Sequence, residues 1–420
     1  MTMYARRLPT RRQTPATEAF EAEVSSVDPE FPTVPKALVV AHYLPPHIGG
    51  LECVAQAEAD GLSAAGFQVK VVTSSCGADA AAAAALETGP DIVRLRAYNG
   101  FEKYGVPFPI FTPKIFTSGW RLVRWADIVH IHDTLYISSW VTAVLCWLLR
   151  TPYVVTKHVS FVAHPSRVVG AVQLGVNRLF GRWVLAKAQA ILAINPDVER
   201  YVVEDEPHFR SKTRVLLNGV DTNRFRPPTG TAEIAEIRTR YGLPGGALVL
   251  FAGRFVPKKR LELLLECDSD HYTIVFAGGG PDDPSRSSGN RVFLGSLAQG
   301  QLAEVYRAVD IFVCPSISEH IPLTVLEALA SRLPVVVEDD STDDLSSLFG
   351  EQLIRVPDLA SNLAEVLDNL AMEVTHPRTG GDQGVEAVAE SFSLDAHIRN
   401  LSAAYVEVLD TRRADRPQLS

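Results

Sequence analysis

Short runs rich in valine, isoleucine and leucine alternate with amphipathic helical stretches along this chain, and they do so in two consecutive series. This alternation is typical of β-α-β units built around a parallel sheet. The first series contains expected strands at Ala37–Ala41, Val69–Thr73, Ile128–His132, Tyr153–Thr156 and Ala190–Ile194. The second contains expected strands at Leu248–Phe251, Thr273–Phe276, Arg291–Leu294, Ile311–Val313 and Pro334–Val337. The predicted fold class is α/β, with two Rossmann-like domains whose parallel sheets face a central cleft.

The length of the chain fits two such domains. Its 420 residues are 46% apolar, which is enough to fill two hydrophobic cores. Breaker-rich stretches at Pro227–Gly230 and Leu243–Gly246 separate the two series. Residues 1–35 mix both charges and prolines without apolar periodicity, so we expect a disordered extension there. In folds of this kind ligands bind beyond the carboxyl ends of the strands, so the residues after each strand matter most.

The charge balance and the cysteines argue against several classes of protein. A formal net charge of −9 does not suit a nucleic-acid-binding protein, which neutralises phosphates with cations. The five cysteines are scattered without metal-binding or redox spacing, which indicates a reducing compartment. The first 35 residues contain no apolar signal core, and the run Trp140–Leu149 is too short to span a bilayer. The sequence therefore predicts a cytoplasmic protein without a transmembrane helix.

Two glycine-rich loops follow expected strands. Gly49 and Gly50 precede a helix, where glycines let the main chain pass close to an anion at the helix N-terminus. Gly279 lies in a run of glycines after the strand at Thr273–Phe276, where the main chain can approach the cleft in the same way. A plain turn explains either loop as well.

Two cations follow the strand that ends at Gly253. Arg254 comes directly after this glycine, and Lys259 lies five positions further on. Two cations that converge beyond one strand end suit a diphosphate, because they stabilise a departing nucleoside diphosphate without a metal ion. The alternative is that both are solvated surface charges.

The most informative segment surrounds a predicted helix near Pro322–Ser331. Pro322 suits the first helical turn, so Glu319 falls in the preceding loop and Glu327 projects from about the second turn. The start of this helix offers free amides to a phosphate, with Glu319 placed for a sugar hydroxyl and Glu327 for a ribose hydroxyl. The residues expected around the phosphate are His320, Ile321, Pro322, Leu323 and Thr324. Two glutamates that merely cap a surface helix would suit this apolar segment poorly.

From about Lys36 to the C-terminal helix the chain resembles a family 4 glycosyltransferase. The resemblance implies the GT-B fold and transfer of a sugar with retention at the anomeric carbon, without an essential metal. The matching stretches are the loop that ends in Gly49–Gly50, Asp127–Asp133, Thr156–His158, Val215–Asp221 with Phe225, Gly253–Arg254 with Lys259, and the pair Glu319 and Glu327.

The resemblance also implies roles for domains and residues. Residues 36–212 would hold the acceptor, residues 213–390 would bind a UDP- or GDP-linked sugar donor, and a helix within 391–420 would cross back to the first domain. Gly50 would contact the donor phosphate, and His158 would lie beside the transferred sugar. Arg254 and Lys259 would hold the diphosphate, Glu319 the sugar and Glu327 the ribose. His320 stands where the family usually has glycine, which is expected to alter the sugar pocket. No cofactor and no metal are expected.

Two other patterns are weaker. Asp268 and Asp270 form a D-x-D sequence, but they precede a strand instead of following one, so we expect a solvated turn. His130 and His132 alternate onto one face of a strand, as two metal ligands would. A structural or substrate-contacting role is expected, because the sequence places no third ligand beside them.

An apolar stripe runs along the expected helix between Arg167 and Lys187. Its members are Val169, Val172, Val176, Phe180 and Trp183, while Arg178 and Arg182 lie elsewhere on the helix. The stripe either faces the protein core or rests on an anionic membrane at its inner face, which would suit a lipid-linked acceptor.

The predicted function is therefore a retaining hexosyltransferase that moves a sugar from a nucleoside-diphosphate donor to a saccharide, lipid-linked or small-molecule acceptor. The alternatives are a sugar-nucleotide-binding protein without turnover and an epimerase-like enzyme of the same architecture. No nucleic-acid partner is expected.

Overall fold

The computed structural model describes nine stretches of the chain. The predicted extension, residues 1–35, lies almost wholly outside the described residues. The side chains of residues 167–169, 172 and 344–347 are not described either. The described stretches are 34–47, 49–76, 90–100, 108–159, 167–280, 290–316, 321–339, 344–374 and 382–414.

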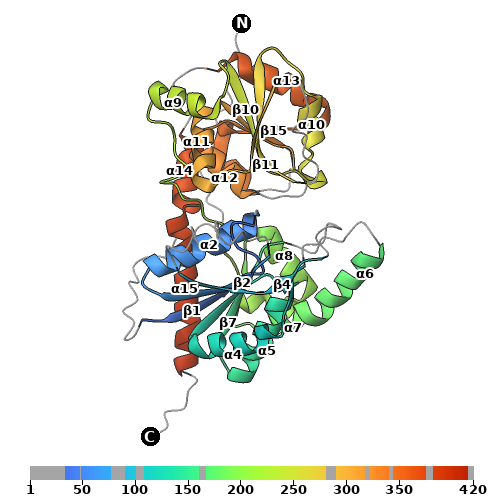
Figure 1. Cartoon of the computed structure of the whole chain (residues 1–420), viewed down its shortest axis with the longest axis vertical. Helices are drawn as coiled ribbons and strands as arrows, with labels where there is room; N and C mark the ends of the chain where they lie inside the picture. Colours follow the sequence, from blue (N-terminus) through green and yellow to red (C-terminus); the bar gives the residue numbers. More distant parts are fainter. Residues whose placement is uncertain are drawn as a thin grey trace, which may run out of the picture. The chain divides into compact units, whose positions relative to one another are not determined.

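Seven parallel strands form the first sheet, in the order β3-β2-β1-β6-β7-β8-β9 (Figure 1). Their bounds are β1 Lys36–Val40, β2 Gln68–Ser74, β3 Asp91–Leu95, β6 Ile128–His132, β7 Tyr153–Lys157, β8 Ala190–Ala193 and β9 Thr213–Val215. The helices of this part are α2 Gly50–Ala64, α4 Lys114–Trp125, α5 Ile137–Leu149, α6 Arg167–Val176, α7 Arg182–Lys187 and α8 Pro196–Asp205. The π-helical turn η2 Asn177–Gly181 joins α6 to α7, the 3-10 turn η3 Pro207–Lys212 precedes β9, and a small antiparallel pair consists of β4 Ala97–Tyr98 and β5 Ile110–Phe111.

Six parallel strands form the second sheet, in the order β12-β11-β10-β13-β14-β15. Their bounds are β10 Ala247–Arg254, β11 Tyr272–Gly279, β12 Arg291–Gly295, β13 Ile311–Cys314, β14 Val335–Glu338 and β15 Leu353–Val356. The α-helices here are α9 Thr231–Tyr241, α10 Leu261–Glu266, α11 Gln299–Ala308, α12 Leu323–Ala330, α13 Leu359–Met372 and α14 Gln383–Ser391. Two 3-10 turns complete this part, η4 Pro257–Lys259 and η5 Asp344–Gln352.

Both sheets are parallel because helices cover both of their faces. Every residue of β6 and β7 is buried, and so are the first six residues of β10, as expected for strands with no solvated side. In the first sheet α4, α5 and α7 pack on one face. In the second sheet α11, α12 and α14 pack on one face, and α10 and α13 pack on the other. Two Rossmann-like α/β domains result, as the sequence predicts.

The last helix, α15 (Leu394–Ala414), packs against α2. Its buried residues recur at helical spacing and include Ile398, Leu401 and Tyr405. The ring of Tyr405 meets Phe67 edge to face, with the ring centroids 5.8 Å apart. α15 thus covers, together with α2, the face of the first sheet that α4 and α5 leave open (Figure 1).

The sheet boundary differs slightly from the expectation. Strand β9 pairs with β8, so the first sheet runs past position 212, the predicted end of the first domain. Among the described residues, no helix combines the length and the hydropathy that a membrane span requires.

Candidate functional site

Most of the predicted site residues that the structure describes lie beyond the carboxyl ends of strands at the two places where the strand order reverses. In the first sheet this place is between β1 and β6, and in the second it is between β10 and β13. Such a switch point leaves a crevice at the carboxyl edge, because the connections on either side of it run to opposite faces. Gly49 and Gly50 follow β1, Gly253 and Arg254 end β10, and α12 follows β13. Asp268 and Asp270 precede β11 and so lie at the other edge of the second sheet, as expected.

Two aromatic stacks shape the loop after β1. The ring of His42 stacks on Tyr136 with centroids 3.4 Å apart, and Tyr43 stacks on His47. Burial lowers the pKa of His42 to about 4, although nearby carboxylates oppose this shift. His42 is therefore neutral at physiological pH.

Gly49 and Gly50 have different surroundings at the start of α2. A side chain on Gly49 would collide with the carboxylate of Glu52, which is bonded to Nδ1 of His47 at 2.8 Å. A side chain on Gly50 would meet nothing within 4 Å. Close packing therefore explains glycine at position 49. Position 50 instead leaves the first turn of α2 open to a ligand.

His158 follows β7 and is buried beside other imidazoles. Its Nε2 lies 2.9 Å from Nδ1 of His132. Burial and the neighbouring His132 lower the pKa of His158 to about 3, so this ring is neutral. Next to it, Lys157 donates a hydrogen bond of 2.5 Å to Asp133. Burial alone would raise the pKa of Asp133, but Lys157 outweighs it and the pKa falls.

Arg254 and Lys259 flank the end of β10. Arg254 is exposed, and Lys259, at the end of η4, is half-buried. Gly253 has a φ of +150°, and the Cε of Lys259 lies 3.8 Å from the place where a Cβ of Gly253 would be. The lysine side chain therefore lies over the bare backbone of the strand end.

Packing between neighbouring strands explains the glycine run at the end of β11. Gly253 and Gly278 are paired in the sheet, and a Cβ on Gly278 would lie 1.8 Å from the carbonyl oxygen of Gly253. Gly279, in register with Arg254, meets the hydroxyl of Ser296 instead. Close approach of two neighbouring strands, and not a turn, therefore accounts for Gly278.

Glu327 occupies the second turn of α12, as expected, with its carboxylate buried. Burial raises its pKa to about 8, although a hydrogen bond from Tyr306 and the charge of Arg224 act in the opposite direction. One oxygen, Oε2, is buried without a hydrogen-bond partner. Thr324 Oγ1, one turn earlier, is in the same situation. A buried acceptor without a partner is costly unless a ligand supplies the donor.

The rest of the predicted helix-start segment is described in part. Ile321, Pro322, Leu323 and Thr324 are half-buried at the N-terminus of α12, where Pro322 takes the N-cap position. Glu319 and His320 lie outside the described residues.

The start of α2 and Glu327 lie close enough to influence each other. Burial raises the pKa of Cys53 to about 11, and the carboxylates of Glu327 and Glu52 add to this shift. A hydrogen bond with Gln299 opposes it. The charge of Glu327 in α12 therefore acts on Cys53, which lies one turn after Gly50 in α2.

Sequence reasoning missed several residues of this site. Tyr136 and Tyr306 belong to no sequence motif. Their place in the site is apparent only from the contacts of Tyr136 with the His42 ring and of Tyr306 with the Glu327 carboxylate. Asp133 and Lys157 lie in two of the stretches that carry the family resemblance, but the sequence does not predict the contact between them.

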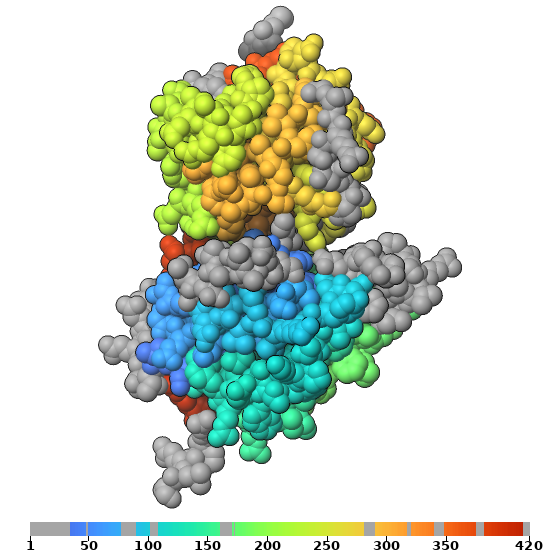
Figure 2. Space-filling view, viewed as in Figure 1, coloured from blue at the N-terminus to red at the C-terminus, as the bar shows by residue number. Residues whose placement is uncertain are grey.

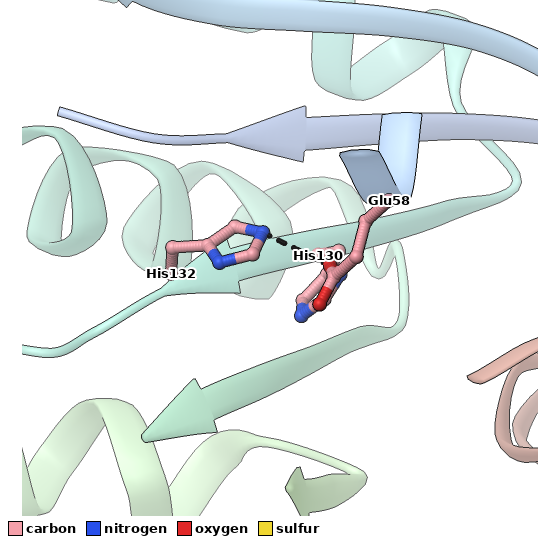
Figure 3. Close-up of side chains that lie close together, drawn as sticks. All are labelled: Glu58, His130 and His132. Carbon is pink, nitrogen blue, oxygen red and sulfur yellow. Dashed lines mark ion pairs between the residues drawn. The ribbon is translucent and has the colours of Figure 1, made fainter. Parts of the chain in front are cut away.

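The structure also supplies the third group that the sequence did not place beside His130 and His132. Glu58 of α2 lies 3.2 Å from Nδ1 of His130 and 3.3 Å from Nε2 of His132 (Figure 3). All three side chains are fully buried. Glu58 is therefore a third potential ligand that the sequence did not reveal, and the expected structural or substrate-contacting role of the two histidines stays a prediction.

The apolar stripe of the helix between Arg167 and Lys187 is only partly buried. Val169 and Val172 have side chains outside the description. Val176 and Trp183 are half-buried, whereas Phe180 is 43% exposed and stacks on Trp140. This helical stretch is therefore not a simple core helix.

Two family profiles match consecutive parts of the chain. Residues 48–224 match "Glycosyltransferase Family 4", and residues 233–343 match "Glycosyl transferases group 1". The boundary between them follows β9 and precedes β10.

Curated relatives align over most of the chain. The glycosyltransferase TuaC of Bacillus subtilis (strain 168), provisionally assigned to teichuronic acid biosynthesis, is 29% identical over 323 residues, which are 75% of this chain and 79% of the relative. The 2-deoxystreptamine glucosyltransferase of Streptomyces kanamyceticus is 24% identical, over 68% of this chain and 78% of that protein. The D-inositol 3-phosphate glycosyltransferase of Mycolicibacterium smegmatis is 26% identical, over 88% of this chain and 89% of that protein.

Solved structures share the fold. The sucrose-phosphate synthase of Thermosynechococcus elongatus superposes with a TM-score of 0.64 at 21% identity, and 90% of this chain covers 100% of that one. HepE of Anabaena, solved in complex with UDP-glucose, superposes with a TM-score of 0.66 at 16% identity, over 89% of this chain and 99% of that one.

Proposed function

This chain belongs to glycosyltransferase family 4, group 1, with the GT-B fold, and on that premise we propose that it transfers a sugar from a nucleoside-diphosphate donor with retention of the anomeric configuration. The donor diphosphate is held without a metal ion, and no cofactor takes part. Uridine is the favoured base of the donor, since HepE, which shares the fold, is solved with UDP-glucose.

The observation that carries this proposal is the buried carboxylate of Glu327. Its Oε2 has no hydrogen-bond partner, and burial keeps much of the group protonated at neutral pH. A ribose offers two adjacent hydroxyl donors, which would satisfy this oxygen and restore the charge. A nucleoside therefore suits the site better than a bare phosphate, which has no such donors.

The positive field for the diphosphate comes from three sources. Arg254 and Lys259 stand at the end of β10, with Lys259 over Gly253. The first turn of α2 adds its free amides at Gly50, where the backbone is open. Together these groups stabilise the charge that develops on the leaving nucleoside diphosphate, which is the term that most lowers the barrier in such a site.

Glu319 and His158 complete the proposed catalytic set. We assign Glu319 to the hydroxyls of the transferred sugar and His158 to the same sugar from the first domain. A neutral imidazole at position 158 can donate one hydrogen bond to a sugar hydroxyl without adding charge beside the anomeric carbon.

For the acceptor, exposed side chains favour a substrate that is presented at a membrane. An apolar face formed by Phe116 and Trp120 of α4 and by Val144, Trp147 and Leu148 of α5 is exposed. These two helices pack together, and Figure 2 shows their segments, in teal, at the surface. Arg121, Arg124 and Arg150 are exposed beside them. Aromatic residues with neighbouring arginines suit the interface of an anionic membrane, so we propose peripheral binding and a lipid-linked acceptor.

A donor and acceptor panel tests the proposed function. Purified protein is incubated with UDP- and GDP-linked sugars and with saccharide, small-molecule and lipid-linked acceptors, and the products are identified by mass spectrometry. The anomeric configuration of the product is read by NMR. Transfer with retention supports the proposal, and activity should not depend on added Mg²⁺ or Mn²⁺. UDP binding without transfer would indicate a sugar-nucleotide-binding protein, and an epimerised donor would indicate an epimerase-like enzyme.

A further inference from the structure

A buried cluster of one carboxylate and two imidazoles joins α2 to β6. Glu58 projects from α2 toward His130 and His132, which lie on the same face of β6 (Figure 3). The three ligand atoms all lie within 4.8 Å of one another. None of the three side chains reaches solvent.

The three atoms that face one another have no hydrogen-bond partner. These atoms are Oε2 of Glu58, Nδ1 of His130 and Nε2 of His132. Although the two nitrogens lie only 3.2 and 3.3 Å from Oε2, neither meets it with hydrogen-bond geometry. Orphaned buried polar atoms are rare in folded proteins, and three that converge on one point call for a shared partner.

The opposite atom of each side chain is firmly held. Nε2 of His130 is 2.6 Å from Oγ1 of Thr156, and Nδ1 of His132 is 2.9 Å from Nε2 of His158. Oε1 of Glu58 is 2.9 Å from Nε2 of His397. Metal-bound histidines and carboxylates are oriented in this way, with the second atom of each ligand in a hydrogen bond.

Two of the three distances between the ligand atoms match a zinc ion that these side chains would hold at three of its four tetrahedral positions. Zinc bound at about 2.0–2.1 Å in a tetrahedron separates its ligand atoms by roughly 3.3 Å. The observed separations of 3.2 and 3.3 Å between Oε2 and the two nitrogens agree with this value. We propose that Glu58, His130 and His132 bind one zinc ion inside the first domain.

The role of this ion is structural. A fully buried site has no open face for a substrate, so the ion would join α2 to β6 and, through Glu58 and His397, hold α15 against them. It would also fix the tautomer of His132, because zinc on Nε2 leaves the proton on Nδ1. The Nδ1–H group then donates a hydrogen bond to Nε2 of His158, so His158 carries its own proton on Nδ1.

The rival explanation is a network held together by protons alone, in which both imidazoles donate weakly to Glu58. Metal analysis separates the two. Full-length protein, purified through a tag without histidines and dialysed against metal-free buffer, is analysed by inductively coupled plasma mass spectrometry. We expect about one zinc per chain. Protein that contains no zinc, and takes up none when zinc is added during refolding, would overturn the proposal.

Variants locate the ion. Glu58→Gln keeps the shape and the bond to His397 but lowers the charge of the site, so zinc should fall at least tenfold. His208→Gln removes an exposed histidine outside the cluster and should keep the full content. Equal zinc in Glu58→Gln and in the parent would place the metal elsewhere and contradict the assignment.

Reconstitution covers the case in which Glu58→Gln fails to fold. Parent protein is stripped with a strong chelator in mild denaturant and refolded with Co²⁺, whose visible absorption reports tetrahedral coordination. Zinc added to stripped protein should raise the melting temperature by at least about 2 °C. Stripped protein that melts like the untreated parent and stays colourless with Co²⁺ would refute the site.

Discussion

Nε2 of His397 lies 2.9 Å from Oε1 of Glu58, a buried contact between side chains 339 positions apart. The other nitrogen of the same ring, Nδ1, lies 2.6 Å from the carbonyl oxygen of Leu217. One imidazole on α15 therefore joins the helix that follows the first strand to the segment that follows the last strand of the same sheet. The C-terminal helix is part of the first domain's core rather than an appendage.

His397→Ala should destabilise the protein by about 2–3 kcal/mol, because it removes a buried hydrogen bond to a carboxylate and leaves Oε1 of Glu58 without its partner. Glu407→Gln on the same helix is the matched control. Glu407 pairs with Arg214 at the exposed surface, and such pairs are worth less than about 1 kcal/mol. Urea unfolding followed by circular dichroism compares them. Equal shifts of the two midpoints would mean that the buried bond contributes little.

Glu327→Gln should weaken binding of UDP by about 1–3 kcal/mol, because the amide is uncharged and its nitrogen cannot accept a hydrogen bond from the ribose in place of Oε2. Calorimetric titration measures this loss. Glu304→Gln, on the neighbouring helix α11, serves as control, since Glu304 is bonded to Arg240 and Tyr241. Unchanged UDP affinity in Glu327→Gln would show that the ribose does not bind this carboxylate.

The affinity for UDP should depend on pH through the same group. The pKa of Glu327 in the free protein is about 8, and a ribose that donates to the carboxylate lowers it, so binding releases a proton. Affinity should therefore rise by up to about tenfold between about pH 7 and about pH 9. The free protein should lose stability as the pH rises from about 4.5 to about 8, where the unfolded chain is ionised and the folded carboxyl is still protonated, and the loss should level off above about pH 8. Titrations in buffers of different ionisation enthalpy count the protons released, and Glu327→Gln should show neither effect.

Two glycine substitutions should have opposite consequences. Gly278→Ala should destabilise the second domain, because its Cβ would collide with the carbonyl of Gly253 and its φ is +150°. Gly50→Ala meets open space and should leave the melting temperature within about 1 °C, yet lower turnover by crowding the donor phosphate. Thermal melts and steady-state kinetics test the pair. Normal turnover in Gly50→Ala would argue against a phosphate at the start of α2.

Trp120→Ser combined with Trp147→Ser should reduce sedimentation with anionic vesicles at least tenfold, because both indoles are exposed on the α4–α5 face. Tyr98→Ser is a matched control, since Tyr98 is 71% exposed on β4, outside that face. Vesicles without anionic lipid should bind the parent weakly. If the control and the double variant bind alike, this face does not contact the membrane.

The pattern of apolar residues is enough to predict the helices and strands whose own sequence has a clear hydrophobic periodicity. The expected strand Ile128–His132 agrees with β6 residue for residue. The short strands β3, β9 and β15 were not expected, because each lies at or beside a sheet edge and is only partly apolar or partly buried. Their pairing depends on the neighbouring strand more than on their own sequence.

The residues of the candidate site likewise divide into those that the sequence predicts and those that it does not. The positions of Gly50, Arg254 and Glu327 at strand ends and at a helix start follow from the chain order, so the sequence places them correctly. The buried carboxylate of Glu58 could not be foreseen. A glutamate inside a helix is normally solvated, and His130 lies 72 positions away in the sequence. Only the packing of α2 on β6 brings them together.

The bond between Glu58 and His397 also sets an order of events during synthesis. A ribosome that adds about 5–20 residues per second needs roughly 20–70 seconds to make the 339 positions between them. The strands β2 to β9 emerge within that interval, since β9 ends at Val215, but one face of α2 lacks the helix that covers it until α15 has been made. The nascent first domain therefore waits, with an apolar groove and an unpaired carboxylate exposed, until the second domain has been made. Chaperones that recognise exposed apolar surface should engage this chain in that window and release it when α15 docks.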